Sequence, residues 1–258
     1  MRASSAYSLF DTESVWAILM RIAPPVMLAQ LIQAMYNIVD SYFVGQFSSD
    51  GLTALSIVYP VQLIVTAIAV GTGVGVNTLM SRYDGQGNRH LADHAAGTGT
   101  VLALVSWLLF AIVSGLLMGP FAAASTDSPS VAEHAITYGT IVCVGSLGVF
   151  LESTWSKVHQ ARGNMRLPML AQIAGAVTNI VLDLFFVVVL HLDVLGVGLA
   201  TVMSQVVSAV LVAVSLLRPG TVYAVVPREI RFHPDKLRAI VRIGLPAGVQ
   251  SNMYTISN

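Results

Sequence analysis

The chain has 258 residues, of which 55% are hydrophobic and only 10% are charged, and its formal net charge is zero. Soluble domains carry roughly 25% charged residues, so most of this chain is expected to lie out of contact with water. A zero net charge excludes an electrostatic attraction to nucleic acid. The single cysteine, Cys143, excludes a disulfide framework and a cysteine-ligated metal site.

Apolar segments long enough to cross a bilayer follow one another along the chain. About 20 apolar residues span the hydrocarbon core as a helix, and six segments meet this length. They run over residues 16–44, 52–80, 91–118, 131–155, 167–190 and 194–217. A seventh begins near Leu237 and is expected to continue beyond Asn258. The sequence therefore predicts an all-α, polytopic membrane protein with a six-helix lobe and the start of a seventh helix.

The predicted segments divide the chain into four parts: an N-terminal segment (1–15), the six-helix lobe (16–217), a linker (218–236) and the truncated start of a second lobe (237–258). All 13 Lys and Arg residues precede or open the first helix, or follow the second, fourth or sixth helix. Cytoplasmic connections carry an excess of such residues. The N-terminus and the linker are therefore expected in the cytoplasm, in a multi-pass protein of the cell inner membrane or plasma membrane.

Two acids stand out inside the predicted membrane helices, Asp40 in the first and Asp183 in the fifth. A charge near the bilayer centre costs about 2.5–3.5 kcal/mol on the insertion scale, and such residues usually serve a transport pathway. The helical rise of 1.5 Å per residue places Asp40 about 9 Å and Asp183 about 12 Å from the outer ends of their helices. Neither acid has a Lys or Arg within seven residues along the chain.

Further polar residues share this level of the membrane. By the same rise, Tyr138 lies about 12 Å and Thr201 about 10 Å from the outer ends of their helices. Asn179 precedes the acid of the fifth segment by four residues, and Asn37 precedes that of the first by three, so each amide shares a helix face with its acid.

Two interpretations of this polar group remain open. The acids can be interfacial, or neutral and hydrogen-bonded between packed helices. Alternatively, the group is a cation site. Carboxylate, amide and hydroxyl oxygens suit a metal cation, and a desolvated carboxylate takes up a proton near neutral pH. The sequence does not separate a proton from a sodium ion.

Other polar residues carry weaker signals. Glu152 lies near the inner end of the fourth segment, where an interfacial acid is preferred to a transport role. His90 and His94 stand beside Asp93 at the start of the third segment, where a solvated helix start is preferred to a metal site. The run GTGVG at 71–75 is interpreted as close helix packing, since no strand precedes it and no GK[ST] follows.

Motifs for enzymatic chemistry are missing from the sequence. It contains no Walker A motif, and no Ser/His/Asp or metalloprotease signature at membrane depth. The chain is therefore expected not to be an enzyme and to use no cofactor, and an ion gradient is its expected source of energy.

Three stretches carry a family resemblance, namely PPVMLAQLIQAMYNIVDSYFVG at 24–45, QARGNMRLPML at 160–170 and TNIVLDLFFVVVLHLDVLGVGLATVMSQ at 178–205. They resemble the N-terminal half of the multidrug and toxic compound extrusion (MATE) family. The resemblance implies that five residues correspond to the cation site of that family's N-terminal lobe, namely Asp40, Asn179, Asp183, Tyr138 and Thr201. A further polar position of the family's fourth helix, often Asn, falls near Ser153.

The resemblance also implies a function. Members of the family export amphipathic or cationic, drug-like compounds by antiport against protons or sodium ions. The coupling ion, H⁺ or Na⁺, is the expected ligand of the site, with no other metal. Drug-like substrates and membrane lipid are the expected partners.

Members of the family have twelve helices in two six-helix lobes, so a second lobe is expected from a missing C-terminal half. Residues 21–37 align without gaps to 242–258 with four identities, which favours parallel repeats. Two alternatives remain. One is a flippase of similar fold for a lipid-linked substrate, which a wide cationic lumen would favour, although the predicted helices carry no interior Arg or Lys. The other is a half-length remnant that does not transport.

Overall fold

The computed structural model describes residues 15–217 and 231–256, and it contains helices and no strands within these ranges. The helices are α2 (Val15–Phe47), α3 (Ser49–Gly85), α4 (Arg89–Ser125), α5 (Pro129–Val144), α6 (Leu147–Ala161), α7 (Arg166–Asp183), the π-helix η1 (Leu184–Val189), α8 (Asp193–Leu217) and α9 (Pro234–Ile256). Much of the predicted N-terminal segment and linker, residues 1–14 and 218–230, lies outside the described residues.

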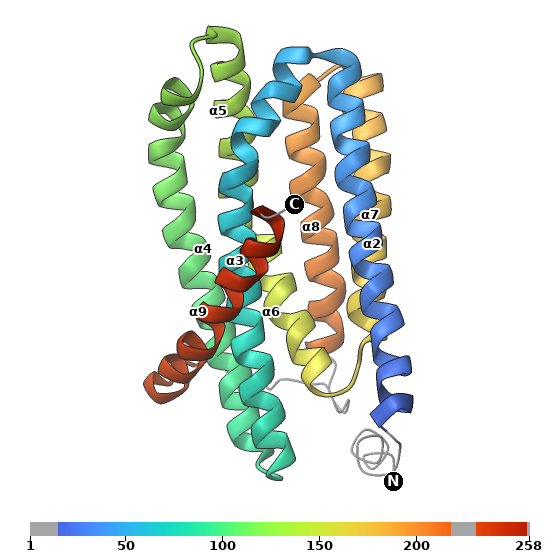
Figure 1. The fold of residues 1–258 in the computed structure, drawn as a ribbon, viewed down its shortest axis with the longest axis vertical. Coiled ribbons are helices and arrows are strands. Elements are labelled where there is room, and N and C mark those ends of the chain that lie inside the picture. Colours follow the sequence, from blue (N-terminus) through green and yellow to red (C-terminus); the bar gives the residue numbers. More distant parts are fainter. Residues whose placement is uncertain (1–14, 218–230, 257–258) are drawn as a thin grey trace.

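The helices form six long segments, here called rods, which lie side by side along the long axis of the molecule (Figure 1). Four are α2, α3, α4 and α8; α5 and α6 together form another, and α7 and η1 the last. In the described part, five rods are long and apolar enough to cross a membrane. The remaining rod, α2, has 33 residues, which is also sufficient length. The predicted all-α, polytopic fold is confirmed.

Local sequence explains the tight turns between the rods. The Ser48 Oγ accepts a hydrogen bond of 2.8 Å from the Gly51 amide and caps α3. The Asn88 Oδ1 accepts a hydrogen bond of 3.3 Å from the Leu91 amide and caps α4. Each cap satisfies one of the free amides at a helix start. Gly87 has a φ of 72°, a conformation that favours glycine, and it reverses the chain between α3 and α4.

The fourth predicted segment is interrupted at Gly145 and Ser146, although the sequence analysis treated it as continuous. A Cβ atom at Gly145 would lie 2.5 Å from Val202 Cγ2 of α8, so the break allows α8 to approach closely. The Trp107 Nε1 donates to the Val144 carbonyl at 2.9 Å. The Ser146 Oγ donates to the Cys143 carbonyl at 2.7 Å. These bonds satisfy carbonyls at the break, which is how irregular backbone is tolerated at membrane depth.

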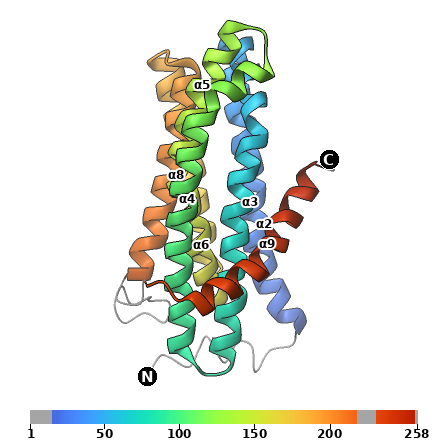
Figure 2. The ribbon, with the colours of Figure 1, turned by 90° about the vertical axis from the view of Figure 1, so that its left-hand side faces the viewer.

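The glycine run of α3 packs closely against two other helices, as predicted. A Cβ atom at Gly71 would lie 2.7 Å from the Gly244 carbonyl oxygen of α9. At Gly73 it would lie 2.8 Å from Lys157 Cγ of α6. Small residues permit such backbone approach, so α3 fits between α6 and α9. Figure 2 shows α9 crossing α3 obliquely.

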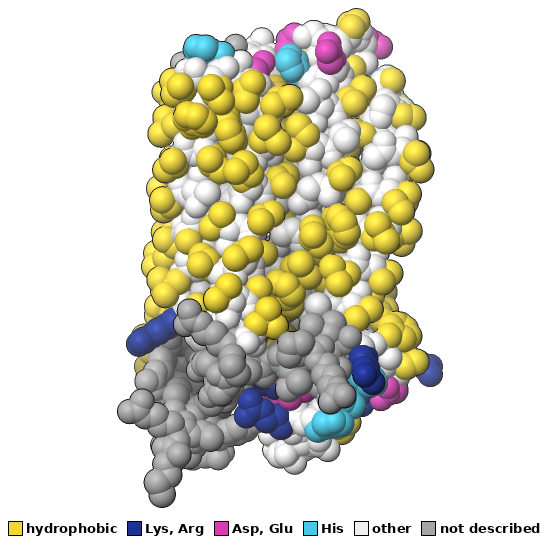
Figure 3. Space-filling view, turned by 180° about the vertical axis from the view of Figure 1, so that it is seen from behind, with side chains coloured by type: hydrophobic (Ala, Val, Ile, Leu, Met, Phe, Trp, Pro, Cys, Tyr) yellow, Lys and Arg dark blue, Asp and Glu magenta, His cyan; other side chains and the backbone are white. Residues whose placement is uncertain are grey.

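Charged side chains gather at the two ends of the rods. On the face drawn in Figure 3, Lys and Arg lie at one end and Asp and Glu lie mostly at the other, with apolar side chains between. Apart from Lys157 inside α6, the Lys and Arg residues with described side chains lie at the ends of α3 and α6, at the starts of α4 and α7, and before or within the first turns of α9. We call this the basic end. The opposite, acidic end holds Asp50, Asp127, Glu133 and Asp193, and no Lys or Arg in the described turns there.

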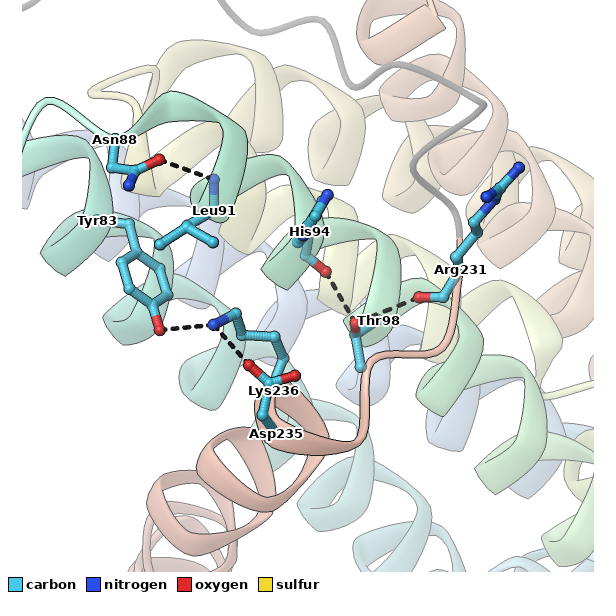
Figure 4. Close-up of polar contacts among 8 residues, drawn as sticks. All are labelled: Tyr83, Asn88, Leu91, His94, Thr98, Arg231, Asp235 and Lys236. Carbon is cyan, nitrogen blue, oxygen red and sulfur yellow. Dashed lines mark hydrogen bonds and ion pairs between the residues drawn. The ribbon is translucent and has the colours of Figure 1, made fainter.

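Polar contacts attach the start of α9 to α3 and α4 (Figure 4). The Lys236 Nζ donates to the Tyr83 hydroxyl at 3.0 Å and pairs with Asp235 at 2.8 Å. The Thr98 Oγ1 donates to the Arg231 carbonyl at 3.3 Å. The chain that enters α9 is therefore held against the basic end of the lobe.

The histidines at the start of α4 also contact this segment. The His94 ring lies 4.1 Å from the ring of His90, and it stacks on His233 at 4.1 Å with an interplanar angle of 11°. Their neighbour Asp93 pairs instead with Arg162. The structure thus gives His94 a packing role at the α9 contact, beyond that of a solvated helix start.

Candidate functional site

A cavity of about 700 Å³ lies within the lobe and is lined by residues of α2, α3, α5, α6, α7 and α8. Three of the predicted site residues are on its wall, namely Tyr138, Asn179 and Thr201. They come from α5, α7 and α8, so residues far apart in sequence meet at one cavity.

Asp183 is fully buried, with 0% of its surface exposed, and it is the last residue of α7. It follows Asn179 by one helical turn, so the two residues share a face of α7. The π-helix η1 begins at the next residue, Leu184. The sequence analysis did not predict it. Short π-helical stretches inside membrane helices are frequent at functional sites.

Asn179 is the most unusual polar side chain of the site. Only 1% of its surface is exposed, and in the described part of the chain neither its Oδ1 nor its Nδ2 has a hydrogen-bond partner. Most buried polar atoms in native proteins are paired, and an exception calls for an explanation, of which a bound ion is one. Asn179 therefore presents a free acceptor and a free donor at the cavity wall.

Tyr138 is held in place by neighbouring helices, and the Thr201 side chain by its own helix. The Tyr138 hydroxyl accepts a hydrogen bond of 3.1 Å from the Gln62 Nε2 of α3. Gly198 of α8 packs on the tyrosine ring, since its Cβ position lies 3.5 Å from Tyr138 Cδ2. The Thr201 Oγ1 donates to the Val197 carbonyl at 2.9 Å, so this oxygen can still accept a hydrogen bond or bind a cation.

The other two predicted site residues, Asp40 and Asn37, belong to α2, which packs beside α7. Their side chains lie outside the described residues. The assignment of both residues to a cation site therefore stays a prediction.

The polar cavity residues that were not predicted as part of the site include Gln62, Glu152, Gln172 and Gln205. The sequence analysis preferred an interfacial acid at Glu152, but the structure places this residue on the cavity wall. The glutamines carry no charge, so their presence at membrane depth gave no comparable signal. Only the packing of α3, α6, α7 and α8 shows that they face one space.

Lys157 corrects a further expectation. The sequence analysis placed it in a connection and found no Lys or Arg inside the helices, whereas it belongs to α6 and lines the cavity. Arg162, at the end of α6, is also buried, with 6% of its surface exposed. It forms ion pairs with Asp93 and, at 3.5 Å, with Asp84.

Comparisons with known proteins agree on one family. The MatE family model matches residues 25–185. The multidrug export protein MepA of Staphylococcus haemolyticus is 23% identical over 239 residues, covering 92% of this chain and 53% of the relative. The FAD transporter of Shewanella oneidensis is 25% identical over 262 residues, covering 93% of this chain and 54% of the relative. The chain thus spans about half the length of these relatives.

Solved structures show the same fold. A MOP superfamily transporter from Pyrococcus furiosus matches with a TM-score of 0.91 at 24% identity, over 99% of this chain and 57% of that one. An outward-facing multidrug resistance MATE family transporter also matches with a TM-score of 0.91 at 24% identity, over 99% of this chain and 57% of that one.

Proposed function

Because the chain belongs to the MatE family, we propose that it forms the N-terminal lobe of a secondary active transporter that exports amphipathic or cationic compounds against protons or sodium ions. The observation that carries the proposal is the fully buried Asp183, which lies one helical turn from Asn179, an unpartnered amide that lines the cavity. A buried carboxylate is energetically costly in a membrane protein, and such residues usually pair with another group or serve a transport pathway.

The coupling ion binds at the acidic-end half of the cavity in this proposal. Asp183 provides the charge, and Asn179, Tyr138 and Thr201 provide neutral oxygens. Asp40 and Asn37 of α2 complete the group. A proton or a sodium ion suits such donors, and no other cofactor or metal is needed.

Ion binding drives export by changing the relative stability of two states. Neutralising Asp40 and Asp183 removes the charge of both acids, so the packing of α2 and α7 changes. Drug affinity falls in consequence, provided that the drug binds the two states differently. The π-helix beside Asp183 is a natural place for such repacking, because its backbone departs from regular α-helix there.

The proposed protein is not an enzyme, and it needs a second six-helix lobe to enclose the substrate. The basic end faces the cytoplasm of a cell inner membrane or plasma membrane, in accordance with the distribution of Lys and Arg. The flippase alternative is less well supported, because the described cavity wall carries one cation, Lys157, together with one acid, Glu152. The other alternative, a half-length remnant, predicts that no transport is measured.

The proposal is tested by dye efflux from cells that express the complete reading frame containing this chain. Efflux of a fluorescent cationic dye is measured with proton and sodium gradients imposed separately, for the wild type and Asp183→Asn. Loss of gradient-driven efflux in the variant supports the antiporter, and the gradient that matters names the ion. The matched control is Asp127→Asn, which changes an exposed acid of the acidic end and is expected to leave efflux intact. Equal efflux in wild type and Asp183→Asn would overturn the coupling role.

A further inference from the structure

The cavity has a second polar region, near Glu152 of α6 and on the basic-end side of the coupling site. Tyr138 and Glu152 are 14 residues apart in the interrupted rod formed by α5 and α6, which corresponds to at most about 20 Å along its axis. Both residues line the same cavity. A ligand that extends along the cavity can therefore meet Glu152 without occupying the position proposed for the coupling ion.

Polar groups from its own helix and from α7 surround the Glu152 carboxylate. The Ser156 hydroxyl donates to Glu152 Oε1 at 2.7 Å. The side chains of Lys157 and Gln172 lie close enough to interact with the carboxylate. This arrangement differs from that of an acid at the bilayer surface, where water provides the hydrogen bonds.

Two acceptor oxygens near this acid lack partners. The Oε1 atoms of Gln172 and Gln205 are buried, and neither has a hydrogen-bond partner within the described ranges. Both residues line the cavity. The backbone of Gln205 packs against Gly148, whose Cβ position lies 2.8 Å from the Gln205 carbonyl carbon. Because Gly148 precedes Glu152 by one turn of α6, Gln205 approaches the same helix face.

The nearby cation, Lys157, is engaged in packing. Its ammonium donates to Gln160 Oε1 at 2.9 Å, and its side-chain stem contacts Gly73 of α3. Its carbonyl oxygen accepts a hydrogen bond of 2.9 Å from Asn77 Nδ2. Lys157 thus joins α6 to α3, while the unpaired acceptors of the region lie on α7 and α8.

We propose that Glu152, Gln172 and Gln205 form a substrate subsite that binds a protonated amine, separate from the coupling site at Asp183. An ammonium group offers three N–H donors, which match one carboxylate and two amide oxygens. Hydrogen bonds between charged groups are about twice as strong as neutral ones, so the subsite selects basic compounds over neutral compounds of the same shape. The subsite rests on the proposed transport function for its biological meaning.

The test is direct binding to the purified protein from the complete reading frame, in detergent and without an ion gradient. Two fluorescent probes are compared, dansylcadaverine, which ends in a protonated amine, and its N-acetyl derivative, which is neutral. The expected result is that Glu152→Gln weakens binding of dansylcadaverine about tenfold, because a charge-assisted hydrogen bond is lost. Binding of the acetylated probe is expected to stay unchanged.

One further variant controls for the general loss of a negative charge, and a second one tests the subsite if Glu152→Gln does not fold. Glu133→Gln makes the same change at an exposed acid of α5, and it is expected to change neither affinity. Gln172→Leu removes one acceptor and is measured if Glu152→Gln does not fold, with a loss of affinity expected for the amine alone. Equal weakening of both probes, or no change for either, would overturn the subsite.

Failure of the subsite is distinguishable from failure of the proposed function. Selective loss of amine binding without gradient-driven efflux in the wild type would keep the subsite and reject the antiporter. Ion-driven efflux by the wild type with no amine selectivity at Glu152 would keep the antiporter and reject the subsite.

Discussion

Arg162 at the end of α6 forms a buried ion pair with Asp93 near the start of α4. A second carboxylate, Asp84 at the end of α3, lies 3.5 Å from the same guanidinium. One side chain thus joins three helices at the basic end of the lobe. Removing one partner of a buried pair leaves an uncompensated charge, at a cost of about 3–5 kcal/mol.

Arg162→Met is therefore expected to destabilise the protein strongly, by about 3–5 kcal/mol. Thermal unfolding of the purified protein measures the effect. The control is Arg166→Met, an exposed arginine four residues further on, for which a change within about 0.5 kcal/mol is expected. Similar unfolding temperatures for the two variants would show that the ion pairs contribute little.

Asn179→Leu is expected to keep the stability of the protein and to abolish its ion-driven transport. Since the Asn179 amide has no partner in the described part of the chain, an apolar residue of similar volume is expected to be neutral or stabilising. Gradient-driven efflux is nevertheless expected to be lost, because the coupling ion loses a ligand. The contrasting variant is Asn77→Leu, which breaks the bond to the Lys157 carbonyl and is expected to lower stability. Retained ion-driven efflux in Asn179→Leu would remove Asn179 from the site.

Gly71→Ala is expected to weaken the contact between α3 and α9. The new methyl group would lie 2.7 Å from the Gly244 carbonyl oxygen, so the helices must separate. Such overpacking typically costs about 1–3 kcal/mol. Gly119→Ala in α4 is the matched control, because nothing lies within 4 Å of its Cβ position. Thermal unfolding compares the two, and equal stability would argue against tight packing at Gly71.

The contact of Lys236 with α3 predicts a dependence of stability on alkaline pH. Hydrogen bonds to Asp235 and Tyr83 raise the pKa of the Lys236 ammonium above its ordinary value. A raised pKa in the folded state gives stability that is present below the unfolded pKa and lost as the pH rises through the folded pKa. The stability difference between wild type and Lys236→Met is therefore expected to be constant up to about pH 10 and to fall above it.

Denaturant unfolding at several pH values from neutral to strongly alkaline checks this prediction. Tyr83→Phe keeps the ring that lies 4.7 Å from the Lys236 ammonium and removes the hydroxyl. It is expected to lose part of the same pH-dependent difference. A difference that stays constant through the alkaline range would contradict the assignment to Lys236.

The sequence predicted the order and approximate bounds of the membrane-length segments because these depend on local hydropathy. The break at Gly145 depends instead on how closely Val202 of α8 approaches, and a single sequence carries no such distance. The π-helix after Asp183 likewise has no composition of its own, since its six residues, LFFVVV, read as ordinary membrane helix.

The candidate site was partly predictable, because a charged residue stands out in an apolar segment and a neutral polar residue does not. The charge of Asp183 made it visible at membrane depth, and helical spacing then drew attention to Asn179. Gln172 and Gln205 had no such signal. Glu152 was visible as an acid, but its position on the cavity wall depends on the rotation of α6 against α7 and α8.

The backbone contact between Gly71 of α3 and Gly244 of α9 limits how these two helices can move. The close approach extends one turn to each side, at Gly75 of α3 and at Gly248 of α9, where a Cβ atom would again meet the opposite backbone. Because the two backbones touch over about two turns, both sliding and rotation of one helix against the other lead to collisions. The helices α3 and α9 are therefore expected to move as one unit.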